Sequence, residues 1–215
     1  MDERIPTILR LCTGPRILDV GCTGGGGPPS DPHLKRYYLH KHLVENFPEV
    51  VGVDVSRENV KKMLELDYKN VFVMNAECID RSKMGKFDTI VAGDLVEHLS
   101  NPGLFLQSAA ECLNPGGRIV IATPNPFSPM FFLMYLKNLI RAFDPEHSLW
   151  MCPQTLSQLA SRYDFSLTKC VFVDFLIPKV VSSIWYKVYG LLWKVVRPIM
   201  PKRIRRWFIV VLERL

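Results

Sequence analysis

The sequence predicts an α/β domain built on a doubly wound, mostly parallel sheet, followed by a basic and apolar helical extension at the C-terminus. Three observations support this prediction. Segments typical of strands alternate with segments typical of helices along most of the chain. The strand segments are continuously apolar, as expected where helices cover both faces of a parallel sheet. Polar side chains gather just after the strand segments, where ligands bind in sheets of this kind.

The strand segments are short, apolar and bounded by turn residues. We expect them at residues 16–20, 50–56, 70–77, 87–93, 118–124 and 166–176. Between them lie segments expected to be helices, at residues 33–46, 57–66, 102–113 and 152–165. Ser56 stands at the N-cap position of the second helix. These elements place residues 1–177 in one domain.

An apolar segment follows the fifth strand. Residues 119–136 contain no charged side chain and are long enough to suggest a membrane span. Pro124, Pro126 and Pro129 interrupt this segment, however, and its first part belongs to a strand. We therefore expect a helical cap at about residues 125–150 that covers the ligand-binding edge of the sheet.

Residues 178–215 form a tail that carries most of the positive charge. The tail contains nine Lys or Arg residues and one Glu, whereas the other residues contain 18 cations and 20 acids, so the net charges are +8 and −2. Lys187, Gly190, Lys194 and Arg197 fall on one stripe of a helix that also contains tryptophans. Such a basic amphipathic helix is typical of proteins that bind an anionic membrane surface. Packing of the tail on the domain, with its lysines reaching solvent, and a contact between two copies are the alternatives.

Composition limits the class of protein. An apolar content of 48% with 22% charged residues is typical of a folded globular chain. The first residues include acids and no long apolar run, so we expect no secretory leader. The six scattered cysteines favour reduced thiols and a cytoplasmic location, on the cytoplasmic face of a membrane if the tail binds one. Because the core is slightly acidic, we expect no nucleic-acid partner.

The stretch "RILDVGCTGGGG", residues 16–27, places five glycines after the first strand. Glycine there allows a positive φ or a close approach of the backbone to a ligand. A dinucleotide-binding loop requires GxGxxG, and that pattern fails at Thr23 when it starts at Gly21 and at Pro29 when it starts at Gly24. Asp19 would also repel a pyrophosphate, whereas it suits a ligand that carries an ammonium group and a sulfonium.

The motifs resemble those of the class I S-adenosylmethionine-dependent methyltransferases over residues 12–176. "ILDVGCTGG" is similar to the first motif, "VVGVDVS" to the second, whose acid holds the ribose hydroxyls, and "NAE" to the third, which flanks the adenine. "FDTIVAGDLVEHL" and "LNPGGRIVIATPNP" resemble the fourth and fifth motifs. The "EH" after the fourth strand and the later His147 are most similar to the small-molecule, type 11 group that includes the ubiquinone-pathway O-methyltransferases.

The resemblance implies S-adenosyl-L-methionine as the cofactor and a set of residues that bind it. These residues are Asp19, Gly21, Cys22, Thr23, Asp54, Val55, Asn75, Ala76, Glu77 and Asp94. Two features depart from the family, since Thr23 replaces the usual middle glycine and Gly21 lies 33 residues before Asp54, more than is usual. We expect the extra residues to form a loop over the cofactor.

His98 is the expected catalytic base, with Glu97 beside it. Methyl transfer to a hydroxyl oxygen requires a group that removes the proton, and a neutral imidazole suits this role. In a helix, Asp94, Glu97 and His98 would share one face. A purely structural role for Glu97 and His98 is the alternative. The three residues together with His147 would also suit a divalent cation, but the sequence alone assigns no metal.

The favoured function is therefore S-adenosylmethionine-dependent O-methylation of a small or lipid-linked acceptor. The alternative is a catalytically silent module that binds S-adenosylmethionine and docks a partner or a membrane through its tail, because Thr23 departs from the motif. A nicotinamide-dependent dehydrogenase is disfavoured by the missing glycine.

Overall fold

The structure is a computed structural model that describes residues 3–30, 35–136, 144–174, 191–193 and 195–215. Seven strands form one sheet in the order β3-β2-β1-β4-β5-β7-β6. The strands are β1 (Arg16–Val20), β2 (Glu49–Asp54), β3 (Val71–Val73), β4 (Phe87–Gly93), β5 (Leu113–Pro124), β6 (Phe165–Val173) and β7 (Trp207–Arg214). Strands β1 to β5 pair in parallel, whereas β7 is antiparallel to β5 and β6. The predicted doubly wound, mostly parallel sheet is confirmed.

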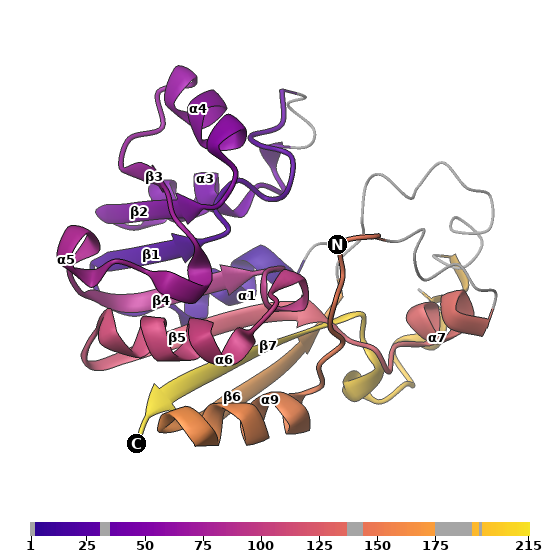
Figure 1. Cartoon of the computed structure of the whole chain (residues 1–215). Coiled ribbons are helices and arrows are strands. Elements are labelled where there is room, and N and C mark those ends of the chain that lie inside the picture. The colour runs from indigo at the N-terminus through magenta and orange to yellow at the C-terminus, as the bar shows by residue number, and fades with distance from the viewer. Residues whose placement is uncertain (1–2, 31–34, 137–143, 175–190, 194) are drawn as a thin grey trace.

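Helices and turns connect the strands (Figure 1). The helices are α1 (Arg4–Leu11), α3 (Leu39–Asn46), α4 (Arg57–Glu65), α5 (Arg81–Met84), α6 (Pro102–Glu111), α7 (Pro129–Leu136) and α9 (Pro153–Ala160). Short 3-10 turns are η1 (Ala76–Cys78), η2 (Val96–His98), η3 (Ser161–Tyr163) and η5 (Lys202–Ile204). Ser56 caps α4 as predicted, because its side chain accepts a hydrogen bond from the Asn59 N–H at 3.3 Å.

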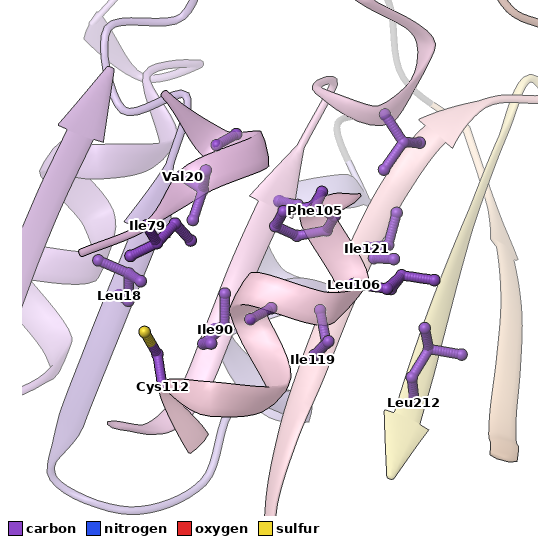
Figure 2. Close-up of a cluster of buried hydrophobic side chains, with 14 of the residues drawn as sticks. Leu18, Val20, Ile79, Ile90, Phe105, Leu106, Cys112, Ile119, Ile121 and Leu212 are labelled. Carbon is purple, nitrogen blue, oxygen red and sulfur yellow. The ribbon is translucent and has the colours of Figure 1, made fainter. Parts of the chain in front are cut away.

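The two faces of the sheet are buried in separate hydrophobic clusters. Neighbouring residues of a strand point to opposite faces, so Leu18 lies in one cluster and Ile17 in the other, and both are fully buried. Figure 2 shows the first cluster, in which Phe105 and Leu106 of α6 pack over side chains of β1, β4 and β5. This double burial explains why the strands are continuously apolar in sequence.

The prediction of a helical tail over residues 178–215 is wrong for its last part. Residues Trp207–Arg214 form β7, which lies between β5 and β6, and the side chains from Phe208 to Leu212 are at most 1% exposed. The run "WFIVVL" is continuously apolar and rich in β-branched residues, which favours a buried strand. The domain therefore includes residues 207–214, and the boundary after residue 177 is wrong in this respect.

The rest of the tail is described only in part. Residues 175–190 and Lys194 of the predicted amphipathic helix lie outside the described residues. Residues 191–193 and 195–196 are helical, and Trp193 is buried. Arg197 forms ion pairs with Glu3 and, through Nε, with Asp174 Oδ2 at 2.7 Å. This part of the tail therefore packs on the domain through one side.

The predicted cap at residues 125–150 is helical in α7, whereas residues 144–150 are not helical and residues 137–143 lie outside the described residues. The loop before α7 is fixed to the segment that leads into β7, because Asn125 Nδ2 donates to the carbonyls of Arg203 at 2.9 Å and Arg205 at 2.7 Å. Figure 1 shows both at the same end of the molecule. Among the described residues, no helix combines the length and the apolar character needed to span a membrane.

Candidate active site

The predicted site residues meet at the carboxyl ends of the parallel strands. The order of strands reverses between β1 and β4, and this is where open α/β sheets bind ligands. The glycine loop follows β1, Asp54 ends β2, and Glu97 and His98 follow β4. The sequence-predicted residues are therefore brought to one edge.

The glycine loop turns back over the end of β2. The N–H groups of Gly21 and Cys22 both donate to the Val53 carbonyl, at 2.8 and 3.1 Å. Gly21 has a φ of 82°, and a Cβ there would come within 3.2 Å of Leu95 Cδ1. Further along the loop, a Cβ on Gly25 would meet no atom within 4 Å. The loop therefore closes tightly against the strands at its start and faces open space in its middle.

Cys22 and Thr23 lie inside this loop with buried side chains. Cys22 Sγ lies 3.8 Å from Met63 Sδ, and burial raises the pKa of the Cys22 thiol well above its usual range. The Tyr38 hydroxyl donates to the Cys22 carbonyl at 2.8 Å. Thr23 is 1% exposed. The side chains of these two residues are therefore not exposed to a ligand above the loop.

Asp54 is half-buried and already has three hydrogen bonds. Its Oδ2 accepts from the Thr23 hydroxyl at 2.7 Å and from the Thr23 N–H at 3.2 Å. Its Oδ1 accepts from the Ser56 N–H at 2.9 Å. Val55, the next residue, is 73% exposed and offers an apolar surface next to the carboxylate. This arrangement fixes the direction in which the carboxylate points.

Asp19 lies beneath the loop rather than facing the open space. It is 2% exposed, and its Oδ2 is 2.9 Å from His40 Nδ1 of α3. Sequence reasoning missed His40, because the only signal was its position three residues before the buried Leu43 on the same helix face. We therefore expect the Asp19 side chain to act on a ligand through the loop and not by contact.

Residues 75–77 form a short turn after β3. Asn75 Oδ1 accepts from the Glu77 N–H at 2.9 Å, which caps η1 and ends the predicted strand early. Glu77 Oε1 in turn accepts from the Asn101 N–H at 2.7 Å, and the buried Ala76 gives its carbonyl to the Ser108 hydroxyl at 3.0 Å. The turn is thus held against α6, at the same edge as Asp54.

Asp94 does not share a face with Glu97 and His98, as the helical spacing predicted. Its φ of 52° is left-handed, and η2 begins only at Val96, so the side chain points elsewhere. It forms an ion pair with Arg4 of α1, and its Oδ1 accepts from Trp207 Nε1 at 2.8 Å. Both carboxylate oxygens therefore have partners from the ends of the chain.

Glu97 and His98 meet the distant His147 at the end of β4. The Glu97 carbonyl accepts from the N–H groups of Ser148 at 2.9 Å and Leu149 at 3.1 Å, which brings His147 to His98. The two imidazole rings lie 4.6 Å apart between centroids and are nearly perpendicular. One ligand atom from each of Glu97, His98 and His147 lies within 4.8 Å of the others.

The environment shifts the titration of this cluster. Glu97 is 2% exposed, and its Oε2 accepts from the Thr123 hydroxyl at 2.8 Å, whereas Oε1 has no hydrogen-bond partner among the described residues. Burial raises the pKa of Glu97 to about 7. Burial and the neighbouring His98 lower the pKa of His147. The Glu97 carboxyl can therefore gain and lose its proton near neutral pH.

Comparison with known proteins finds one family and several curated relatives that this chain resembles. A family model described as "Methyltransferase domain" matches residues 1–169. A ubiquinone biosynthesis O-methyltransferase of a Caulobacter species is 33% identical over 120 residues, which are 52% of this chain and 42% of that protein. The chain spans about half the length of the curated relatives it matches.

Solved structures share the fold. A SAM-dependent methyltransferase from Archaeoglobus fulgidus superposes with a TM-score of 0.62 at 20% identity. The superposition covers 99% of this chain and 90% of the Archaeoglobus chain. The N-methyltransferase NodS from Bradyrhizobium japonicum, in complex with S-adenosyl-L-homocysteine, superposes with a TM-score of 0.61 at 12% identity. The superposition covers 99% of this chain and 86% of the NodS chain.

Proposed function

Because this chain belongs to the methyltransferase family whose model matches residues 1–169, we propose that it uses S-adenosylmethionine to methylate a hydroxyl oxygen of a small acceptor. The observation that carries this proposal is the cluster of Glu97, His98 and His147 at the end of β4. The donor sulfonium is already activated, so the protein has to hold the acceptor in line and remove its proton. The similar proteins named ubiquinone biosynthesis O-methyltransferase support an oxygen acceptor.

His98 is our proposed base. It is half-buried, so a hydroxyl can reach it, whereas Glu97 is enclosed. The lowered pKa of His147 keeps that ring neutral at physiological pH, so it does not repel a proton that His98 takes up. Glu97 is buried next to the two imidazoles, and its ionised form balances the positive charge that forms there. Glu97 and His147 are thus positioning residues in this mechanism.

The cofactor residues follow from the same edge. Asp54 would accept from the ribose, Val55 and residues 75–77 would flank the adenine, and the backbone of residues 21–23 would face the methionine part. Asp19 and Asp94 have partners within the protein, so we propose that they position the glycine loop and η2.

Turnover tests the proposal and separates it from the silent binding module. Purified protein is incubated with methyl-labelled S-adenosylmethionine and a panel of phenols and catechols, with and without an isoprenoid chain. We expect a labelled methyl ether, and His98→Ala should lower kcat by about 10²- to 10⁴-fold. Binding of S-adenosylhomocysteine should be unchanged in that variant. Cofactor binding without turnover on any acceptor would favour the silent module, and labelled amines would redirect the proposal to nitrogen.

A divalent cation at the same cluster is a second candidate. One oxygen of the buried Glu97 carboxylate has no hydrogen-bond partner among the described residues, and the neighbouring ligand atoms are two imidazoles and one carboxylate. This donor set suits Mn²⁺ or Zn²⁺ better than Mg²⁺. Loss of turnover in EDTA, restored by one of these ions, would favour the cation. Turnover that EDTA leaves unchanged would favour the base alone.

We also propose that the cap and the tail face an anionic membrane. The apolar side chains exposed there are Phe127, Phe132, Leu133, Leu136, Leu191, Leu192, Val195 and Ile199. Exposed Lys202 and Arg203 follow them. Apolar side chains bordered by cations are typical of interfacial binding. A lipid-linked acceptor could then reach His98 from this end. The free thiols of all six cysteines favour the cytoplasmic face.

A further inference from the structure

The hydrogen bonds of Asp54 are unequally divided between its two oxygens. Oδ2 accepts twice from Thr23, through the hydroxyl at 2.7 Å and the N–H at 3.2 Å, whereas Oδ1 accepts once from the Ser56 N–H at 2.9 Å. An ionised carboxylate offers about four acceptor positions, two on each oxygen. Within the described residues, both acceptor positions of Oδ2 are therefore occupied, whereas one acceptor position of Oδ1 is open.

The inequality arises from the side chain of Thr23. A glycine at this position would bring only its N–H to Oδ2. Each oxygen would then accept one N–H and keep one open position, which matches a ribose with two neighbouring hydroxyls. The Thr23 hydroxyl takes the open position on Oδ2.

A ligand would displace the Thr23 hydroxyl only with difficulty. Thr23 is 1% exposed, and its carbonyl is held by the Gly27 N–H at 3.0 Å, so the residue is fixed within the loop. A buried hydroxyl that loses its acceptor must find another or remain unpaired, which is unfavourable. The open position on Oδ1 is the one that a ribose hydroxyl can use without this loss.

We infer that Thr23 makes Asp54 a ligand for one ribose hydroxyl instead of two. The inference rests on the proposed role of Asp54 toward the ribose. It predicts that the protein accepts S-adenosyl compounds in which the other ribose hydroxyl is missing or modified. Thr23 is thus a specificity-determining residue for the cofactor.

Calorimetry with three ligands tests the inference: S-adenosylhomocysteine and its 2′-deoxy and 3′-deoxy forms. In the wild-type protein, the Kd of one deoxy form should lie within about 2-fold of the Kd of the parent compound. The Kd of the other should be about 10- to 100-fold higher, as expected for the loss of one hydrogen bond to a carboxylate. In Thr23→Ala, the Kd of each deoxy form should be at least about 10-fold higher than that of the parent compound. Thr23→Ser keeps the hydroxyl and should keep the inequality.

The outcomes separate this inference from the function on which it rests. Equal weakening of both deoxy forms in the wild-type protein would overturn it, and that measurement needs no variant. An inequality that persists unchanged in Thr23→Ala would also overturn it, because Thr23 would then not be the cause. If Asp54→Asn binds the parent compound as tightly as the wild type, the proposed role of Asp54 fails together with the inference, while methyl transfer itself would remain testable by turnover.

Discussion

The two sides of the ligand-binding edge are built differently. On the side of β1 and β2, the carboxylates of Asp19 and Asp54 already have partners from the protein, and the loop between them is held by backbone hydrogen bonds. On the side of β4 and α7, Glu97 keeps a buried oxygen without a hydrogen bond among the described residues, and Phe132 is 58% exposed.

The difference shows which side is complete before a ligand binds and which side is completed by its ligand. A site whose polar groups are satisfied in advance binds its ligand through the few positions that are left, with little rearrangement. A site with a buried unpaired oxygen and exposed apolar side chains is completed by its acceptor, an ion or a surface. We therefore expect the β1 side to serve a common cofactor and the β4 side to set the acceptor of this protein.

Removal of β7 should have the largest effect, because it joins both sides. Deletion of residues 207–215 removes a strand buried between β5 and β6, together with the Trp207 N–H that binds Asp94. We expect insoluble protein or the loss of a cooperative unfolding transition. A substitution in the exposed part of the tail, Ile199→Ser, is the control and should leave the transition unchanged. A soluble, cooperatively folding deletion variant would show that the sheet is complete without β7.

The free energy of unfolding should depend on pH through the buried carboxyl group of Glu97. The pKa of its carboxyl group is about 7 in the folded protein, above its ordinary value of 4.5. Between these pH values the folded state holds the additional proton, so the free energy of unfolding falls as the pH rises, by about 3 kcal/mol in total. Glu97→Gln should remove this fall. The measurement is urea unfolding of both proteins from pH 4.5 to 8 in EDTA, and parallel curves would contradict the raised pKa.

Asp94→Ala should destabilise the protein, because Asp94 connects the end of β4 to Arg4 and Trp207. Arg4 is 5% exposed and forms an ion pair with Asp94, whose own side chain is 32% exposed. Removal of the carboxylate deletes this ion pair and the hydrogen bond from Trp207 Nε1, and we expect a loss of about 2 kcal/mol of unfolding free energy. Asp94→Asn should lose less, because it still accepts from Trp207. Glu111 is exposed, so Glu111→Ala is the control for the loss of a surface acid. Equal destabilisation by Glu111→Ala and Asp94→Ala would show that the contacts of Asp94 with Arg4 and Trp207 do not stabilise the protein.

The smallest expected effect concerns the exposed apolar side. Phe132→Ser combined with Ile199→Ser should lower affinity for vesicles rich in anionic lipid by about 3- to 10-fold, because apolar area is lost while the charge is kept. Phe72→Ser is the matched control, since Phe72 is 43% exposed at the opposite edge of the sheet, on β3. Co-sedimentation at low and high salt measures the change. Binding that Phe72→Ser reduces equally would count against a specific surface.

The β1 side was the more predictable from sequence. The strand at residues 16–20 and the capping of α4 by Ser56 were predicted correctly, because short apolar runs and N-caps are local signals. The family resemblance grouped His147 with Glu97 and His98, but the contact between His98 and His147 depends on backbone hydrogen bonds from Ser148 and Leu149 to the Glu97 carbonyl, which no local pattern indicates.

Three features could not be predicted for physical reasons. The Lys and Arg residues on both sides of β7 concealed it, because they favour a surface helix, although the run "WFIVVL" itself is typical of a buried strand. The left-handed φ of Asp94 broke the helical spacing on which the shared face with Glu97 depended. The pairing of His40 with Asp19 joins residues 21 positions apart and left no periodic signal.

The position of β7 also affects how the chain can fold during synthesis. β5 and β6 are made before β7, yet each needs β7 as its neighbour in the sheet, and β6 pairs with no other described strand. Until residues 207–214 leave the ribosome, β6 is an unpaired strand and one edge of β5 is open. Such edges pair readily with other chains. The nascent protein therefore passes through a stage at which a chaperone that covers strand edges would raise the yield, and a stall in translation before β7 would favour aggregation.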